Sequence, residues 1–205
     1  YSPHLWPGGE ADDLERVESQ VDTIDCFDIN AKDQYGRTLL ALAATSGNLS
    51  LTKLLLKCDG VDTNIKDVGG MTPLGHAAMW NQAAILDLFL QDGSVDVNCR
   101  DNRGDTPLAF AAEQGNETVV VSLLCREDVQ PDSRNDALAT PLAMAAERGH
   151  ERVVLLLLNH AGVEADSTDK EGCTPLARAA AMGFERIVRL LLDCPGVNVN
   201  SRDND

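Results

Sequence analysis

A period of 34 residues runs through most of this 205-residue chain, and it constrains the fold more than any other feature. Self-similarity at such a period is typical of arrays built from one repeated supersecondary unit, so we expect a stack of repeats rather than a conventional globular domain. The positions that keep the register are Thr38, Thr72, Thr106, Thr140 and Thr174; Leu40, Leu74, Leu108, Leu142 and Leu176; the Ala pairs that begin at Ala43, Ala77, Ala111, Ala145 and Ala179; Asn30, Asn64, Asn98, Asp132, Asp166 and Asn200; and Asp33, Asp67, Asp101, Asn135, Asp169 and Asp203.

Each repeat predicts two helices joined by a turn. The Thr is an N-cap and, from Thr72 onwards, is followed by a proline at the first helical position, where the missing N–H costs nothing. The Ala-rich first helix ends near a glycine, or near Asn81 in the second repeat. A turn glycine precedes the Thr by two residues, except where Leu138 replaces it. Apolar residues at helical spacing predict second helices near 50–57, 84–91, 118–125, 152–159 and 186–193.

No single unit of this kind can bury both of its helices, so we expect neighbouring units to stabilise one another by stacking. The first helices carry small Ala side chains, whereas the second helices carry bulky Leu and Val side chains. The first helices can therefore approach one another more closely. We expect the stack to curve, with the first helices and the turns on its concave side.

The stretch from Met71 to Ala78, its counterpart from Asp105 to Ala112, and their equivalents resemble the ankyrin signature Thr-Pro-Leu-His-x-Ala. The resemblance covers about residues 30 to 205. It implies an all-α fold, an α-solenoid of stacked ankyrin helix-turn-helix repeats with β-turn or hairpin connections. The family's usual His after the Leu, a side chain that normally braces the turns, is replaced throughout by Ala41, Gly75, Ala109, Ala143 and Ala177.

The register also predicts the domain boundaries. We expect an N-terminal extension and degenerate capping half-repeat at 1–32, with an acidic helix-like segment at 10–29. Linkers such as Cys58-Asp59-Gly60-Val61-Asp62 are similar to those of ankyrin arrays in fungal multidomain, receptor-like proteins, so we expect the chain to belong to a larger polypeptide. The five repeats are predicted at 33–66, 67–100, 101–134, 135–168 and 169–202, with a further one starting at 203–205.

Charge and composition narrow the partners. The net charge of −16 disfavours nucleic acid and anionic lipid, which are bound by Lys and Arg, and no apolar run is long enough to span a membrane. A protein partner with a basic surface fits this charge, although a charge that simply keeps the chain soluble is the simpler interpretation. The six scattered cysteines predict a reducing, intracellular setting, which we take to be the cytoplasm. We expect a monomer without a cofactor, metal site or catalytic residues.

The ankyrin resemblance implies that partners are bound at the turn tips and at the ends of the first helices. Side chains that vary there, while their neighbours keep the register, are the candidates. Their apolar members would form a patch over the first two repeats, because Trp and Tyr are common binding anchors; an equally favoured interpretation is that Trp80 covers a repeat junction. The candidates are Tyr35, Arg37, Met71, Met79, Trp80, Arg103, Glu113, Glu147, Arg148 and Met182.

The sequence therefore leaves three hypotheses about the function of the chain. A non-catalytic protein-binding module is favoured over an accessory array that positions a catalytic or effector domain, and least favoured is a small-molecule binder or an enzyme. A Lys or Arg precedes most turns, and an Asp or Asn follows it directly. We interpret this column as local charge balancing rather than as a basic stripe; its members are Lys32, Lys66, Arg100, Arg134 and Arg202.

Overall fold

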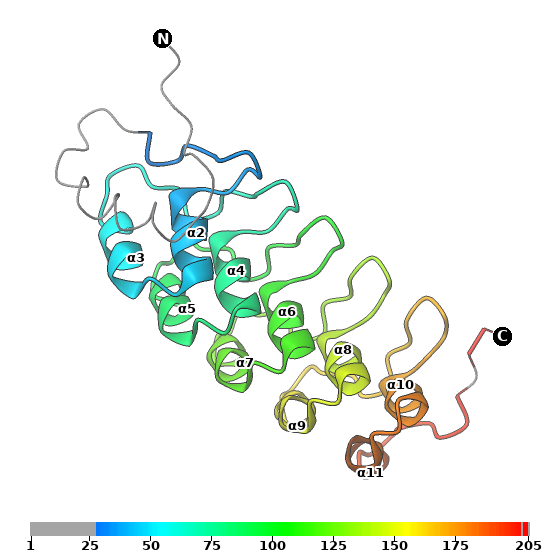
Figure 1. Ribbon diagram of the computed structural model, residues 1–205. Helices are drawn as coiled ribbons and strands as arrows, with labels where there is room; N and C mark the ends of the chain where they lie inside the picture. The colour runs from blue at the N-terminus through cyan, green and yellow to red at the C-terminus, as the bar shows by residue number, and fades with distance from the viewer. Residues whose placement is uncertain (1–27, 202, 205) are drawn as a thin grey trace. The chain divides into compact units, whose positions relative to one another are not determined.

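The computed structural model describes residues 28–201, 203 and 204, which form ten α-helices and no strand (Figure 1). The segment predicted as an acidic cap lies outside the described residues, apart from its last two. The predicted all-α solenoid of helix pairs is confirmed. The helices are α2 (Leu39–Ser46), α3 (Leu49–Leu55), α4 (Pro73–Met79), α5 (Ala83–Leu90), α6 (Pro107–Gln114), α7 (Glu117–Leu124), α8 (Pro141–Arg148), α9 (Glu151–Leu158), α10 (Pro175–Ala181) and α11 (Glu185–Leu192).

The chain divides into two compact units, Tyr1–Asp96 and Val97–Asp205, which we call unit 1 and unit 2. In unit 1, α2 packs against α4 and α3 against α5. In unit 2, α8 lies between α6 and α10 in one layer, while α9 contacts α7 and α11 in a second layer (Figure 1). Each repeat thus contributes one helix to each layer of its unit. None of the helices in the described part of the chain is long and apolar enough to cross a membrane.

The register threonines begin the first helices as predicted. At all five, the hydroxyl oxygen accepts a hydrogen bond from the backbone N–H three residues on, at 3.2–3.3 Å. Such an N-cap stabilises a helix by about 1 kcal/mol. The second helices begin and end within two residues of the predicted ranges.

Left-handed residues end the first helices and shape the turns. Gly47, Gly115 and Gly149 cap their helices with φ of 74–83°, and Asn81 takes the same region with φ 56°. Leu138, which stands where other repeats have a turn glycine, is also left-handed, with φ 58°. This conformation costs a branched L-residue roughly 1–2 kcal/mol, so Leu138 is strained.

The core of each unit consists of the register apolar residues. The Leu two residues after the Thr is at most 1% exposed in the first four repeats, and the Ala pairs of those repeats are fully buried. The second helices contribute larger side chains, such as Leu55 and Phe89 in unit 1 and Leu123 and Leu157 in unit 2, all fully buried. The buried Ala pairs of the first helices and the buried Leu and Val side chains of the second are what the sequence predicts, and the first helices also bury large side chains such as Phe110 and Leu142.

The linkers after the second helices are tied by a ladder of side-chain amides. Asn30 donates from Nδ2 to the Gly60 carbonyl at 2.8 Å and accepts at Oδ1 from the Asp62 N–H at 2.9 Å. Asn64 and Asn98 make the same pair of bonds 34 residues apart. In the next two repeats this position holds an aspartate, Asp132 or Asp166, in place of the asparagine. Oδ1 of both carboxyl groups is buried without a hydrogen-bond partner.

The column of Lys and Arg before the turns also has a role that the sequence did not predict, because its members bind backbone carbonyls. Lys32 donates to the Lys66 carbonyl at 3.0 Å, Arg100 donates to the Arg134 carbonyl, and Arg134 donates to the Thr168 carbonyl at 3.5 Å. The interpretation as local charge balancing is therefore wrong for Lys32, which makes no ion pair within the described residues, whereas Arg134 also lies 3.9 Å from Glu164 Oε2. The long side chains of all three residues reach a backbone carbonyl of the following repeat; Arg202 lies outside the described residues.

Candidate functional site

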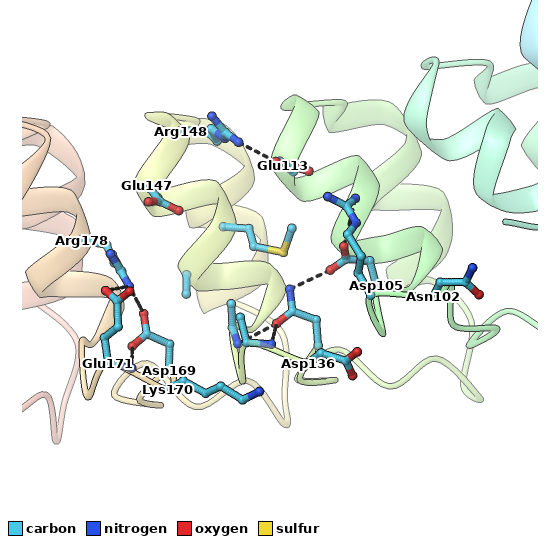
Figure 2. Close-up of a pocket in the computed structure, with 16 residues that line it drawn as sticks. Asn102, Asp105, Glu113, Asp136, Glu147, Arg148, Asp169, Lys170, Glu171 and Arg178 are labelled. Atoms are coloured by element: carbon cyan, nitrogen blue, oxygen red, sulfur yellow. Dashed lines mark hydrogen bonds and ion pairs between the residues drawn. The ribbon is translucent and has the colours of Figure 1, made fainter. Parts of the chain in front are cut away.

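A groove with a volume of about 580 Å³ lies in unit 2, over α6, α8, α10 and the turns that precede them (Figure 2). Its lining includes the buried side chains of Ala143 and Met144, together with six carboxylate and four cationic side chains. An apolar lining with several charged groups is typical of a surface that binds and orients a partner. The charged groups are Asp105, Glu113, Asp136, Glu147, Asp169, Glu171, Arg103, Arg148, Lys170 and Arg178.

The turns that carry many of these charges share one hydrogen-bond pattern. Oδ1 of Asp169 accepts from the N–H groups of Glu171 and Cys173, at 2.9 and 3.0 Å. Asp33, Asp67, Asp101 and Asn135 repeat this pattern in the other turns. Only one side-chain oxygen is used for the turn itself. The second oxygen, or the amide nitrogen in Asn135, is left for a partner that differs from one repeat to the next.

That partner is an arginine in the turns of Asp33, Asp101 and Asp169, and a histidine in the turn of Asp67. Arg178 donates to Asp169 Oδ2 at 2.6 Å and to Glu171 at 2.7 Å (Figure 2), and the hydrogen bond to Asp169 raises the pKa of Arg178. In unit 1, Arg37 pairs with Asp33 at 2.8 Å, and His76 Nε2 lies 3.0 Å from Asp67 Oδ2. The braces that the missing family His would supply are therefore present, on other residues.

Asp105 is the most buried acid of the groove, at 2% exposure. It accepts from Asn135 Nδ2 at 2.8 Å and lies 3.2 Å from an Arg103 nitrogen. Burial raises the pKa of Asp105, against the opposing effects of Asn135 and Arg103. This carboxyl group joins two successive turns, so its role is structural.

At the other end of the first helices, Arg148 donates to Glu113 at 2.7 Å, from α8 to α6 (Figure 2). The backbone carbonyl of Glu113 also lies 2.8 Å from His150 Nε2. Glu147, the residue before Arg148, makes no ion pair within the described residues. The groove therefore contains one satisfied and one free carboxylate at the ends of neighbouring helices.

The predicted candidates fall into two groups, one in each unit. Arg103, Glu113, Glu147 and Arg148 line the groove, whereas Met182 is 57% exposed at the end of α10 and does not line it.

In unit 1, Tyr35 and Trp80 are 52% and 56% exposed, and Met71 and Met79 are half-buried. Arg37, bound to Asp33, stacks over the Tyr35 ring at 4.9 Å.

Six charged groove residues were not among the predicted candidates: Asp105, Asp136, Asp169, Lys170, Glu171 and Arg178. A signal for Arg178 exists in the sequence, because its register column otherwise holds Leu42, His76, Phe110 and Met144. An arginine that replaces an apolar or aromatic residue in such a column needs an acidic partner. Asp136 and Lys170 offer a weaker signal, since turn tips vary in most repeats.

Other reactive side chains are dispersed. Five cysteines in the described part of the chain are free thiols, and Cys26 lies outside it. Within the described ranges, no group of three or more His, Cys, Asp or Glu side chains is placed to hold a metal ion.

A family model described as "Ankyrin repeats (3 copies)" matches residues 10–101, 59–135, 81–169 and 119–203. These overlapping matches cover most of the sequence, and the chain belongs to the ankyrin-repeat family. Ankyrin repeats are generally protein–protein interaction modules, and the family is typically non-catalytic. The comparison with curated proteins finds no match.

Proposed function

We propose that this chain is a non-catalytic module that binds a protein partner through the surface formed by its turns and first helices. The groove over α6, α8 and α10 carries the proposal. The backbone around the groove is nearly the same in each repeat, with the same N-cap and the same turn. The side chains that line the groove differ from repeat to repeat. A surface that varies on a constant scaffold is suited to recognising one particular partner.

The exposed candidates of unit 1 support the same function. Tyr35 and Trp80 are large side chains of which more than half is exposed, and Trp80 stands at the end of α4. Burial of such rings against a partner is the kind of contact that contributes most to binding. Unit 1 thus offers apolar anchors, and unit 2 offers a charged groove.

The wider setting is part of the proposal. We place the chain within a larger fungal polypeptide, on the resemblance of its linkers, and in the cytoplasm, on its dispersed cysteines. As a separate chain it is a monomer. The complete reading frame and its cellular location test these points.

Comparative capture tests the binding surface. Ala137 is exposed and lines the groove, so Ala137→Trp fills the groove while its backbone hydrogen bonds remain. Val121→Trp is the matched control, because Val121 is exposed on α7 in the other layer. Proteins captured from an extract of the source cells are quantified by mass spectrometry for the wild type and both variants. We expect a partner that the control retains and Ala137→Trp loses. Loss on Val121→Trp alone contradicts the proposal.

A further inference from the structure

The ion pair between Arg148 and Glu113 identifies what a carboxylate at the end of a first helix accepts in this fold. Glu113 lies in the last turn of α6, and Arg148 lies in the last turn of α8, one repeat later. A guanidinium nitrogen approaches a Glu113 oxygen to 2.7 Å. The Glu113 side chain is only 15% exposed, so the arginine covers it.

One repeat further on, the carboxylate of this ion pair is present but the arginine is missing. Glu147 follows Glu113 by one period of 34 residues, and Met182 follows Arg148 by the same step. The position that supplies a guanidinium in one repeat therefore supplies a thioether in the next. Glu147 has no ion pair within the described residues, and Met182 is 57% exposed.

The groove does not supply the missing cation from within. Its arginines are engaged: Arg103 with Asp101 and Asp105, Arg148 with Glu113, and Arg178 with Asp169 and Glu171. Lys170, the remaining cation, stands in the turn before α10, away from the helix end that carries Glu147 (Figure 2). With six carboxylates against four cations, the lining has an excess of negative charge.

We propose that Glu147 binds an arginine side chain of the partner, which takes the place that Arg148 occupies on Glu113. This inference rests on the proposed function and names the chemistry of the partner. A guanidinium matches a carboxylate with two parallel N–H donors, and its aliphatic stem covers apolar surface such as the exposed Met182. The partner is a protein segment with an accessible arginine.

Peptide binding to the full 205-residue chain tests this inference. The probes are fluorescent octapeptide pools in which one position is fixed as arginine, citrulline or glutamate and the others are randomised. Citrulline keeps the shape of arginine and lacks its charge. We expect arginine pools to bind about tenfold more tightly than citrulline pools, as charge-assisted hydrogen bonds require. Glutamate pools should bind least.

Two variants remove this preference by different routes. Glu147→Gln removes the charge, and Met182→Arg supplies the missing guanidinium from within the chain. Glu117→Gln is the control, because it changes a half-exposed carboxylate on α7, in the other layer. The arginine preference should disappear in the first two variants and persist in the control.

A preference that survives Glu147→Gln, or equal binding of citrulline pools to the wild type, overturns the inference. The groove-filled variant Ala137→Trp then separates the two proposals. If it loses all peptide binding, the groove is still the binding surface and only the role of Glu147 is wrong. If it binds the pools as the wild type does, the proposed function fails as well.

Discussion

In unit 1 the second turn is braced by His76, whereas the corresponding position in the last repeat of unit 2 holds Arg178. Both side chains bind the second oxygen of a turn aspartate, Asp67 or Asp169. Burial lowers the pKa of His76 despite its contact with Asp67, while Arg178 stays charged at every working pH. The same backbone position can therefore be satisfied by a neutral ring or by a permanent charge.

The linkers differ in the same way. Unit 1 uses Asn30 and Asn64 to tie its linkers, and each amide both donates and accepts. Unit 2 begins with Asn98 but continues with Asp132 and Asp166, which cannot donate when ionised. The backbone of the linker is the same in each repeat, but the side-chain group that binds it is an amide in some repeats and a carboxyl in others. The repeat register therefore predicts the backbone scaffold of each repeat, but it does not predict which charges and hydrogen-bonding groups a given repeat carries.

The shared scaffold is tested by the largest expected effect. Leu55→Ala in unit 1 and Leu123→Ala in unit 2 each remove a fully buried side chain from a second helix. We expect each to lower the free energy of unfolding by roughly 2–5 kcal/mol, because a cavity remains. Urea denaturation followed by circular dichroism measures both. A loss below about 1 kcal/mol in one unit only would show that the two cores are not equivalent.

The surface of unit 1 is tested by Trp80→Ala combined with Met79→Ala. Affinity for the partner should fall by about 2 kcal/mol, because truncated aromatic anchors lose this much. The loss should be independent of salt, unlike the loss caused by Glu147→Gln in unit 2. Melting should hardly change, since Trp80 is 56% exposed. Destabilisation as large as that of Leu123→Ala would make Trp80 a core residue.

The sequence predicts those features of the fold that depend on local backbone conformation. The N-caps at Thr38 to Thr174 and the left-handed Asn81 were predictable, because the backbone conformation selects the residue type. The pair between Arg148 and Glu113 was not, since it depends on side chains 35 residues apart in different repeats. The role of Lys32 was misread because a long side chain can bind a carbonyl as well as a neighbouring acid.

The linker ladder is tested by Asp132→Asn, which restores the amide of the earlier repeats. We expect this substitution to raise the free energy of unfolding by about 1 kcal/mol at pH 7, which is the typical net contribution of one hydrogen bond. Burial raises the pKa of Asp132 above its ordinary value of 3.8, with Ser167 and the Glu164 amide acting against this. The native state therefore holds the proton more tightly, and wild-type stability from this group rises as the pH falls toward 3.8.

The advantage of Asp132→Asn over the wild type should accordingly shrink between pH 7 and pH 4, as the pH falls toward the ordinary value of 3.8. His76→Gln should show the opposite trend relative to the wild type. The pKa of His76 is lowered from 6.5, so the wild type loses stability as the pH falls through this value and the variant does not. Urea titrations at both pH values measure how the stability of each variant relative to the wild type changes with pH. A change of the same sign for both variants would contradict the proposed difference between the two units.

The smallest effect is expected for Leu138→Gly. The left-handed strain of the leucine is relieved, but glycine gains more freedom in the unfolded chain. We expect a net stabilisation of about 0.5–1 kcal/mol, measured as a rise in melting temperature. Leu138→Ala is the control, because it shortens the exposed side chain and keeps the strain; equal gains for both variants would contradict the role of φ.

Amide hydrogen exchange of the chain with and without its partner tests the central claim, that the turns and first helices form the binding surface. We expect slower exchange on binding in residues 101–105, 135–148 and 169–181, which contain the groove turns together with α8 and α10. Exchange in the second helices α7, α9 and α11 should be unchanged. Protection confined to those second helices, with the turns unchanged, would contradict the claim.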